Sequence, residues 1–147
     1  MTTLVFAGSF KPAHYGHLNA VLQALEEYRD ARVRILISSK PRDGWTWSQG
    51  LLCWTKLHTT CEVPFEMETT IVGGSPVGAA IDLARQDTEV IVICTSKDDA
   101  QKRYGSLPAE QLFIAEALPG YDASAFRRQY RTVDEYLRDQ FGDGPCP

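Results

Sequence analysis

The chain has 147 residues, of which 44% are hydrophobic and 23% are charged. This length fits one domain with a sizeable core, and the composition is ordinary for a soluble globular protein. The net charge of −4 argues against a general nucleic-acid binder, which would carry a basic face. No apolar run reaches membrane-spanning length and the N-terminus lacks a signal-peptide pattern, so we expect a cytoplasmic protein that binds neither nucleic acid nor membrane.

Runs of apolar and β-branched residues predict five strands, over residues 4–7, 32–38, 65–70, 89–95 and 111–118. Helical spacing of apolar residues predicts four helices, over residues 18–25, 45–58, 77–85 and 125–141. A strand, a helix and a strand in succession indicate a right-handed crossover between parallel neighbours. We therefore expect one α/β domain over residues 1–141: a Rossmann-like fold with a parallel five-stranded sheet, helices on both faces and a flexible tail over 142–147.

A turn precedes the predicted helix at 77–85. Its sequence is Gly-Gly-Ser-Pro, and we interpret Ser75 as the N-cap with Pro76 at the first helical position. A phosphate-binding role for Gly73 and Gly74 is the alternative, but capping needs only local chemistry.

The cysteines are four in number: Cys53, Cys61, Cys94 and Cys146. They show no C-x-x-C pairing, and two of them lie in apolar surroundings, so we predict buried free thiols in preference to a disulfide framework. No Cys/His pair has the spacing of zinc ligands beyond His14 and His17, so we predict no metal held by the protein alone.

The segment from Gly8 to His17 joins the first strand to the first helix and reads Gly-Ser-Phe-Lys-Pro-Ala-His-Tyr-Gly-His. Gly8 allows a tight turn or a close approach to a ligand, and Pro12 stiffens the loop. His14 and His17 are placed where a helix N-terminus offers unpaired N–H groups and the positive end of its dipole. Such a helix end is suited to binding phosphate.

This segment closely resembles the G-[ST]-F-x-P-x-H-x-G-H signature of the nucleotidylyltransferase superfamily, at every fixed position of that pattern. The resemblance implies in-line attack of a phosphomonoester acceptor on a nucleoside triphosphate, with release of pyrophosphate. The form Gly8-Ser9-Phe10 looks more like the adenylyltransferases of that family, so ATP is the favoured donor. A cytidylyltransferase acting on a polyol or sugar phosphate is the alternative within the family, and a non-catalytic nucleotide-binding regulatory module is the alternative outside it.

The resemblance also implies roles within the segment. His17 would contact the α-phosphate oxygens in the transition state, and His14 the region of the α- and β-phosphates. Ser9 and the Phe10 backbone N–H would contact the α-phosphate, and Lys11 would add a cation beside the phosphates or the acceptor. Mg²⁺ would bridge phosphate oxygens, held mostly by the nucleotide and water.

A second family motif, I-S-x-[ST]-x-x-R, holds the β- and γ-phosphates at a late helix, and residues 121–127 resemble a degraded copy. Ser124 and Arg127 match the motif, whereas Tyr121 and Asp122 replace its first two residues. An aspartate facing a triphosphate would repel it. The alternative is that Ser124 is a simple N-cap and that Arg127 lies in solvent.

Charged residues also follow the strand predicted at 89–95, at the edge of the sheet where α/β proteins bind ligands. By resemblance to the family, Lys97 and Arg103 could support the base, the ribose or the leaving pyrophosphate. His58, near the end of a predicted helix, is interpreted as a surface or capping histidine.

The loop after the second predicted strand is similar in position to the acceptor-binding loop of phosphopantetheine adenylyltransferases. Lys40 and Arg42 fall near the family's lysines, although they could be ordinary loop charges. Trp45 is the best candidate to stack on a base because it lies in this loop. Gly50 replaces the family's helix arginine, so the acceptor is not named by the sequence. The resemblance allows a homo-oligomer.

Overall fold

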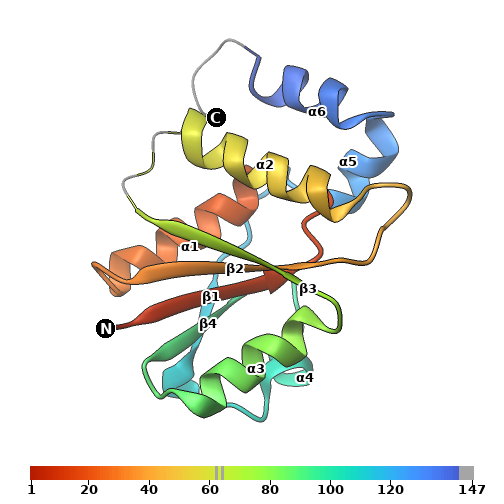
Figure 1. Cartoon of the computed structure of the whole chain (residues 1–147). Helices are drawn as coiled ribbons and strands as arrows, with labels where there is room; N and C mark the ends of the chain where they lie inside the picture. The colour runs from red at the N-terminus through yellow and green to blue at the C-terminus, as the bar shows by residue number, and fades with distance from the viewer. Residues whose placement is uncertain (62, 64, 143–147) are drawn as a thin grey trace.

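The fold is an open parallel sheet of five strands, in the order β3-β2-β1-β4-β5 (Figure 1). The computed structural model describes residues 1–61, 63 and 65–142. Its strands are β1 (Thr3–Gly8), β2 (Arg32–Ser38), β3 (Met67–Val72), β4 (Val90–Thr95) and β5 (Leu112–Ala115). Every neighbouring pair is parallel, which confirms the predicted α/β fold.

Helices cover both faces of the sheet, as predicted (Figure 1). They are α1 (Tyr15–Glu27), α2 (Trp47–Thr60), α3 (Pro76–Gln86), α4 (Ala100–Tyr104), α5 (Ala123–Gln129) and α6 (Val133–Gln140), with a 3₁₀ turn at Ala109–Gln111. One face carries α1 and α2, with α5 and α6 on the same side, and the other face carries α3 and α4. In the part of the chain that the structure describes, no helix combines the length and the apolar character needed to cross a membrane.

The central strand β1 divides the core into two layers. Leu4 and Phe6 pack into the layer shared with α1 and α2, whereas Val5 and Ala7 pack into the layer beneath α3. This alternation follows from the two-residue period of a strand, and burial of both faces explains why β1 is continuously apolar. The chain continues to β2 and β3 on one side of β1 and to β4 and β5 on the other, so a topological switch point lies at the carboxyl ends of β1 and β4.

The predicted helix at 125–141 is wrong in one respect, because two helices occupy this segment. Tyr130 has an extended backbone, with φ −110° and ψ 135°, which ends α5. Thr132 then caps α6: its hydroxyl accepts from the Glu135 N–H at 3.2 Å, and the Glu135 carboxylate accepts from the Arg131 N–H at 3.1 Å.

Other element boundaries are close to those predicted. The strand expected at 65–70 begins and ends two residues later, the one expected at 111–118 is confined to Leu112–Ala115, and α4 was not predicted. Ser75 caps α3 as expected, since its hydroxyl accepts from the Gly78 N–H at 3.0 Å, with Pro76 at the start of the helix. Gly142 is described, whereas the rest of the expected tail, 143–147, lies outside the described residues.

The cysteine prediction is correct in part. Cys53 and Cys94 are buried free thiols. Cys61 is disulfide-bonded, so the prediction of a free thiol is wrong there. Cys146 lies outside the described residues. Sequence spacing does not show which cysteines the fold brings together, which is why the bond was missed.

Candidate active site

A cavity of about 220 Å³ opens at the switch point, between the carboxyl ends of β1 and β4. The β1–α1 loop, the loop after β2, the segment after β4 and the start of α5 with the residues before it form its walls. Most of the residues singled out in the sequence line it: Gly8, Ser9, Phe10, Lys11, His14, His17, Arg42, Lys97, Arg103, Ser124 and Arg127. The fold therefore assembles one site from four separate parts of the chain.

The β1–α1 loop folds tightly over the end of the sheet. Phe10 has a φ of 52°, and a Cβ on Gly8 would lie 3.1 Å from the Phe10 ring, so any larger residue would have to displace that ring slightly. Lys11 is fully buried, and its Nζ donates to the carbonyl oxygens of Ser9 at 2.9 Å and Ser38 at 2.8 Å. This lysine therefore ties the loop to the end of β2.

His14 and His17 form a stacked pair at the start of α1. Their ring centroids are 3.7 Å apart and the rings are inclined by 20°. The His14 backbone N–H donates to Nδ1 of His17 at 3.1 Å, so neutral His17 carries its proton on Nε2. A Cβ on Gly16 would lie 2.9 Å from Nδ1 of His14, which explains the glycine between the histidines.

Both imidazoles are neutral at pH 7. Burial, first, and the Lys97 ammonium together lower the pKa of His14 to about 3, against a smaller opposite effect of Asp122. Burial, then His14, then Lys97 hold the pKa of His17 well below its ordinary value. Nδ1 of His14 is buried and has no hydrogen-bond partner among the described residues. A buried polar atom of this kind is open to a hydrogen bond from a water molecule or a ligand.

The low pKa of His14 predicts a loss of stability in mild acid. The unfolded chain binds a proton at this residue below a pKa of 6.5, whereas the folded chain stays neutral until about pH 3. The free energy of unfolding therefore falls as the pH drops through this window, by about 2 kcal/mol at pH 5 for this one group. Urea unfolding at pH 7 and pH 5 measures it. His14→Gln should lose that part of the difference, and an unchanged difference would contradict the assignment.

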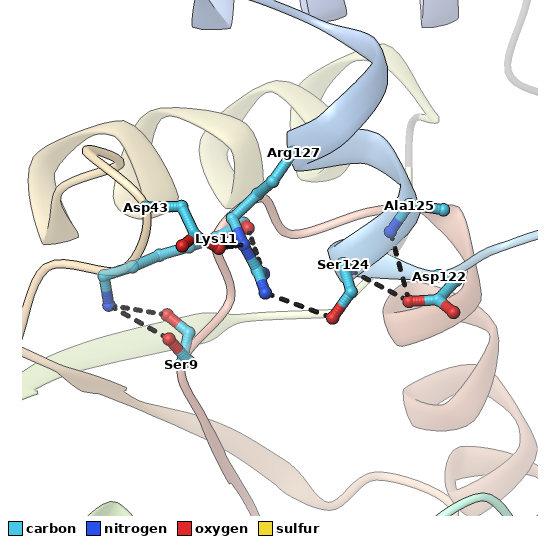
Figure 2. Close-up of polar contacts among 7 residues, drawn as sticks. All are labelled: Ser9, Lys11, Asp43, Asp122, Ser124, Ala125 and Arg127. Carbon is cyan, nitrogen blue, oxygen red and sulfur yellow. Dashed lines mark hydrogen bonds and ion pairs between the residues drawn. The ribbon is translucent and has the colours of Figure 1, made fainter.

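Arg127 lies across the site and binds two loops and a residue of its own helix (Figure 2). Its Nε donates to the Asp43 carboxylate at 2.8 Å, Nη1 to the Lys11 carbonyl at 2.8 Å, and Nη2 to the Ser124 hydroxyl at 3.1 Å. Its side chain is 7% exposed. The alternative that placed Arg127 in solvent is therefore wrong, and every guanidinium nitrogen has a protein partner.

Asp122, and not Ser124, caps α5 (Figure 2). Its carboxylate accepts from the N–H groups of Ser124 at 2.9 Å and Ala125 at 3.4 Å. Burial raises the pKa of Asp122, but these two N–H groups and nearby cations outweigh that effect and lower it overall. Asp122 therefore accepts hydrogen bonds from the backbone N–H groups at the start of α5, which would bind phosphate in the motif that this segment resembles.

The remaining predicted residues differ in placement. Arg103 forms an ion pair with Asp98 at 3.4 Å, and Nζ of Lys97 donates to the Tyr121 carbonyl at 2.5 Å. Lys40 is exposed and does not line the cavity.

Trp45, the candidate to stack on a base, is buried. Only 5% of the residue is exposed, and its ring packs against Tyr136 at 6.2 Å. This placement gives Trp45 a packing role, because neither ring face is open to a base. His58 lies outside the site, with Nε2 at 2.7 Å from the Phe65 carbonyl oxygen.

The sequence interpretation missed two lining residues after β4, Thr95 and Asp98. The Thr95 hydroxyl donates to the Asp98 carboxylate at 3.0 Å, which closes the turn that follows the strand. The strand-end argument that selected Lys97 would have selected both. Across the described residues, no group of three or more His, Cys, Asp or Glu side chains is arranged to hold a metal ion.

Known proteins of similar fold were found among solved structures, but not by sequence. No protein-family model matches the chain, and no curated protein matches it. A solved structure of a bifunctional NMN adenylyltransferase/ADP ribose pyrophosphatase from Francisella tularensis is similar, with a TM-score of 0.68 and 18% identity over 87% of this chain and 41% of that one. A structure of such a bifunctional protein from the same organism, complexed with AMP and a manganese ion, gives a TM-score of 0.58 and 14% identity over 96% of this chain and 50% of that one. The chain spans half or less of these proteins and shares the fold of the part that it matches.

Proposed function

We propose that this chain is a nucleotidylyltransferase, and specifically an adenylyltransferase, that transfers a nucleoside monophosphate from a triphosphate to a phosphomonoester. The observation that carries the proposal is the stacked pair of neutral imidazoles at the switch point. Because Nδ1 of His17 accepts a backbone hydrogen bond, Nε2–H is held as a fixed donor without a positive charge. Preorganised donors of this kind stabilise charge that develops on phosphate oxygens.

The reaction needs no protein nucleophile. An oxygen of the acceptor phosphate attacks the α-phosphorus, and the bond to the pyrophosphate oxygen breaks in line with the attack. The protein aligns the two substrates and stabilises the oxygens of the α-phosphate. His17 would donate to these oxygens, with Ser9 and the Phe10 N–H beside it and His14 stacked on its ring. The similarity to an NMN adenylyltransferase supports ATP as donor.

The acceptor side of the site is positively charged. Lys11 binds neutral carbonyl oxygens, and neither it nor Arg42 has an acidic side-chain partner within the part of the chain described. Burial, then Arg42 and Arg127, lower the pKa of Lys11, which shows that these cations lie close together. An anionic acceptor relieves such repulsion, so a phosphomonoester fits this wall of the cavity.

Mg²⁺ fits the site as a companion of the nucleotide. The two lining carboxylates, Asp98 and Asp122, already bind protein groups, so phosphate oxygens and water would supply the ligands. When bound, the ion neutralises phosphate charge and favours departure of pyrophosphate.

One observation favours a second candidate, a nucleotide-binding module without catalysis. Asp122 caps α5 where the family motif would hold the β- and γ-phosphates, and Arg127 is engaged with Asp43. Such a module would bind ATP and release no pyrophosphate.

Pyrophosphate release tests the proposal. ATP, CTP, GTP and UTP are each combined, with Mg²⁺, with pantetheine phosphate, nicotinamide mononucleotide, a sugar phosphate or a polyol phosphate. We expect one acceptor to give release with ATP; release with CTP and a polyol or sugar phosphate would identify the cytidylyltransferase alternative. ATP binding by calorimetry with no release in any combination would contradict the enzyme and favour the binding module.

A further inference from the structure

The two C-terminal helices hold the histidine loop by its backbone. From α6, the Tyr136 hydroxyl donates to the Ala13 carbonyl oxygen at 2.7 Å. From α5, Arg127 donates to the Lys11 carbonyl at 2.8 Å. These carbonyls lie on either side of Pro12, and Ala13 immediately precedes His14. Segments more than a hundred residues apart in the chain therefore meet at the loop.

The Ala13 carbonyl depends on this contact. Ala13 and Tyr136 are both fully buried, so water does not reach the bond. A buried carbonyl without a donor costs free energy, and a single hydroxyl in a fixed position satisfies this one. Burial, first, and neighbouring groups raise the pKa of Tyr136, so the hydroxyl keeps its proton throughout the working pH range. The hydrogen bond from the Tyr136 hydroxyl to the Ala13 carbonyl oxygen therefore keeps its direction at every working pH.

Tyr136 is also connected to His14 through packed aromatic rings. Its ring packs against four aromatic neighbours, Phe126 at 5.4 Å, Tyr130 at 5.6 Å, Trp45 at 6.2 Å and Phe141 at 6.4 Å. The Phe126 ring in turn lies 5.6 Å from the ring of His14. His14 is therefore constrained through its backbone by the Tyr136 hydroxyl and through its ring by Phe126.

We propose that Tyr136 is a positioning residue, which holds the Ala13 carbonyl and thereby fixes the stacked rings of His14 and His17 for the transfer reaction. This inference rests on the proposed function. It gives a role in the reaction to α6, a helix that follows the motif-like segment 121–127 in the sequence and contributes no residue to the lining of the cavity. A displacement of the rings by a fraction of an ångström weakens an aligned donor without removing it.

Tyr136→Phe tests the inference, because it removes only the hydroxyl. Tyr130→Phe is the matched control: Tyr130 belongs to the same aromatic cluster, but its hydroxyl binds Asp139 and does not reach the loop. Two readouts are taken for each variant. The first is kcat and KM for pyrophosphate release, and the second is the set of proton NMR signals of the histidine rings in the free protein. The chain has only three histidines, and His58 lies outside the site as an internal reference.

We expect Tyr136→Phe to lower kcat about ten-fold with little change in KM, and to shift the ring signals of His14 and His17 but not of His58. Tyr130→Phe should change neither kcat nor the signals. Unchanged kcat, or a lower kcat without movement of the His14 and His17 signals, would overturn the inference.

The NMR signals separate the two proposals. If the unaltered protein releases no pyrophosphate, the proposed function fails, and the ring signals alone decide whether Tyr136 positions the histidines. Thermal unfolding of both variants is measured first, and the kinetic and NMR experiments are done at a temperature at which both are folded. If Tyr136→Phe does not fold, Arg127→Lys replaces it, because this change removes the hydrogen bond to the Lys11 carbonyl on the other side of Pro12. The same shift of the His14 and His17 signals is then expected, and its absence would overturn the anchoring of the loop.

Discussion

His17→Ala is expected to lower kcat for pyrophosphate release at least about a hundred-fold while the protein remains folded. The change removes the Nε2–H donor and also the Nδ1 acceptor of the His14 backbone N–H. We expect the sheet to stay in place, because His17 lies on α1, where it lines the cavity, and not on a strand. Steady-state kinetics under saturating ATP and acceptor measures the effect, and far-ultraviolet circular dichroism checks the fold.

The matched control for this variant is His58→Ala. His58 is also a helical histidine, and it binds the Phe65 carbonyl at 2.7 Å on a part of the molecule outside the cavity. We expect this variant to lose some stability and to keep its kcat. Equal losses of kcat in the two variants would mean that His17 acts through stability and not as a donor to phosphate.

Gly50→Ala is expected to lower the free energy of unfolding by about 1–3 kcal/mol. An added Cβ at this position of α2 would lie 2.6 Å from the Phe10 carbonyl oxygen, so either α2 or the β1–α1 loop must move. The steric cost outweighs the helix preference of alanine, which is up to about 1 kcal/mol. Because Phe10 belongs to the loop of the two histidines, kcat should fall as well. Urea unfolding and steady-state kinetics measure the two effects.

Gly78→Ala in α3 is the control for that substitution. The Cβ there would make an ordinary contact of 3.5 Å with the Cβ of Ser75, so only the gain in helix preference remains. We expect unchanged or slightly increased stability and normal activity. A Gly50→Ala protein as stable and as active as the Gly78→Ala protein would show that α2 does not support the loop.

The fold and the centre of the site could be predicted because local chemistry determines them. The apolar run of β1, the Gly8 turn and the capped start of α1 depend on residues adjacent in sequence, and the switch point follows from the order of strands and helices. The same strand-end argument led to Lys97. The break between α5 and α6 also has a local signal, because Thr132 and Glu135 have the spacing of a capping box. We predicted one helix there because the apolar pattern continues through both segments.

What could not be predicted depends on contacts between distant segments. Trp45 is in a loop, where exposure was the natural expectation, yet α6 brings Tyr136 against its ring. Two of the three partners of Arg127, Lys11 and Asp43, come from different loops, and no spacing in the sequence identifies Asp43 as one of them. From the sequence, Gly50 is only a departure from the family's helix arginine, whereas in the fold its missing Cβ leaves room for the Phe10 carbonyl. Packing of this kind becomes visible only when the chain is folded.

The most direct test of the central claim is to follow the α-phosphate. The protein is incubated with ATP labelled with ³²P at the α-position, Mg²⁺ and each acceptor, and the products are separated by charge and mass. Nucleotidyl transfer predicts that the label joins the acceptor while unlabelled pyrophosphate is released, and that His17→Ala abolishes the labelled product. Label found only in ATP, ADP or AMP with every acceptor would contradict nucleotidyl transfer.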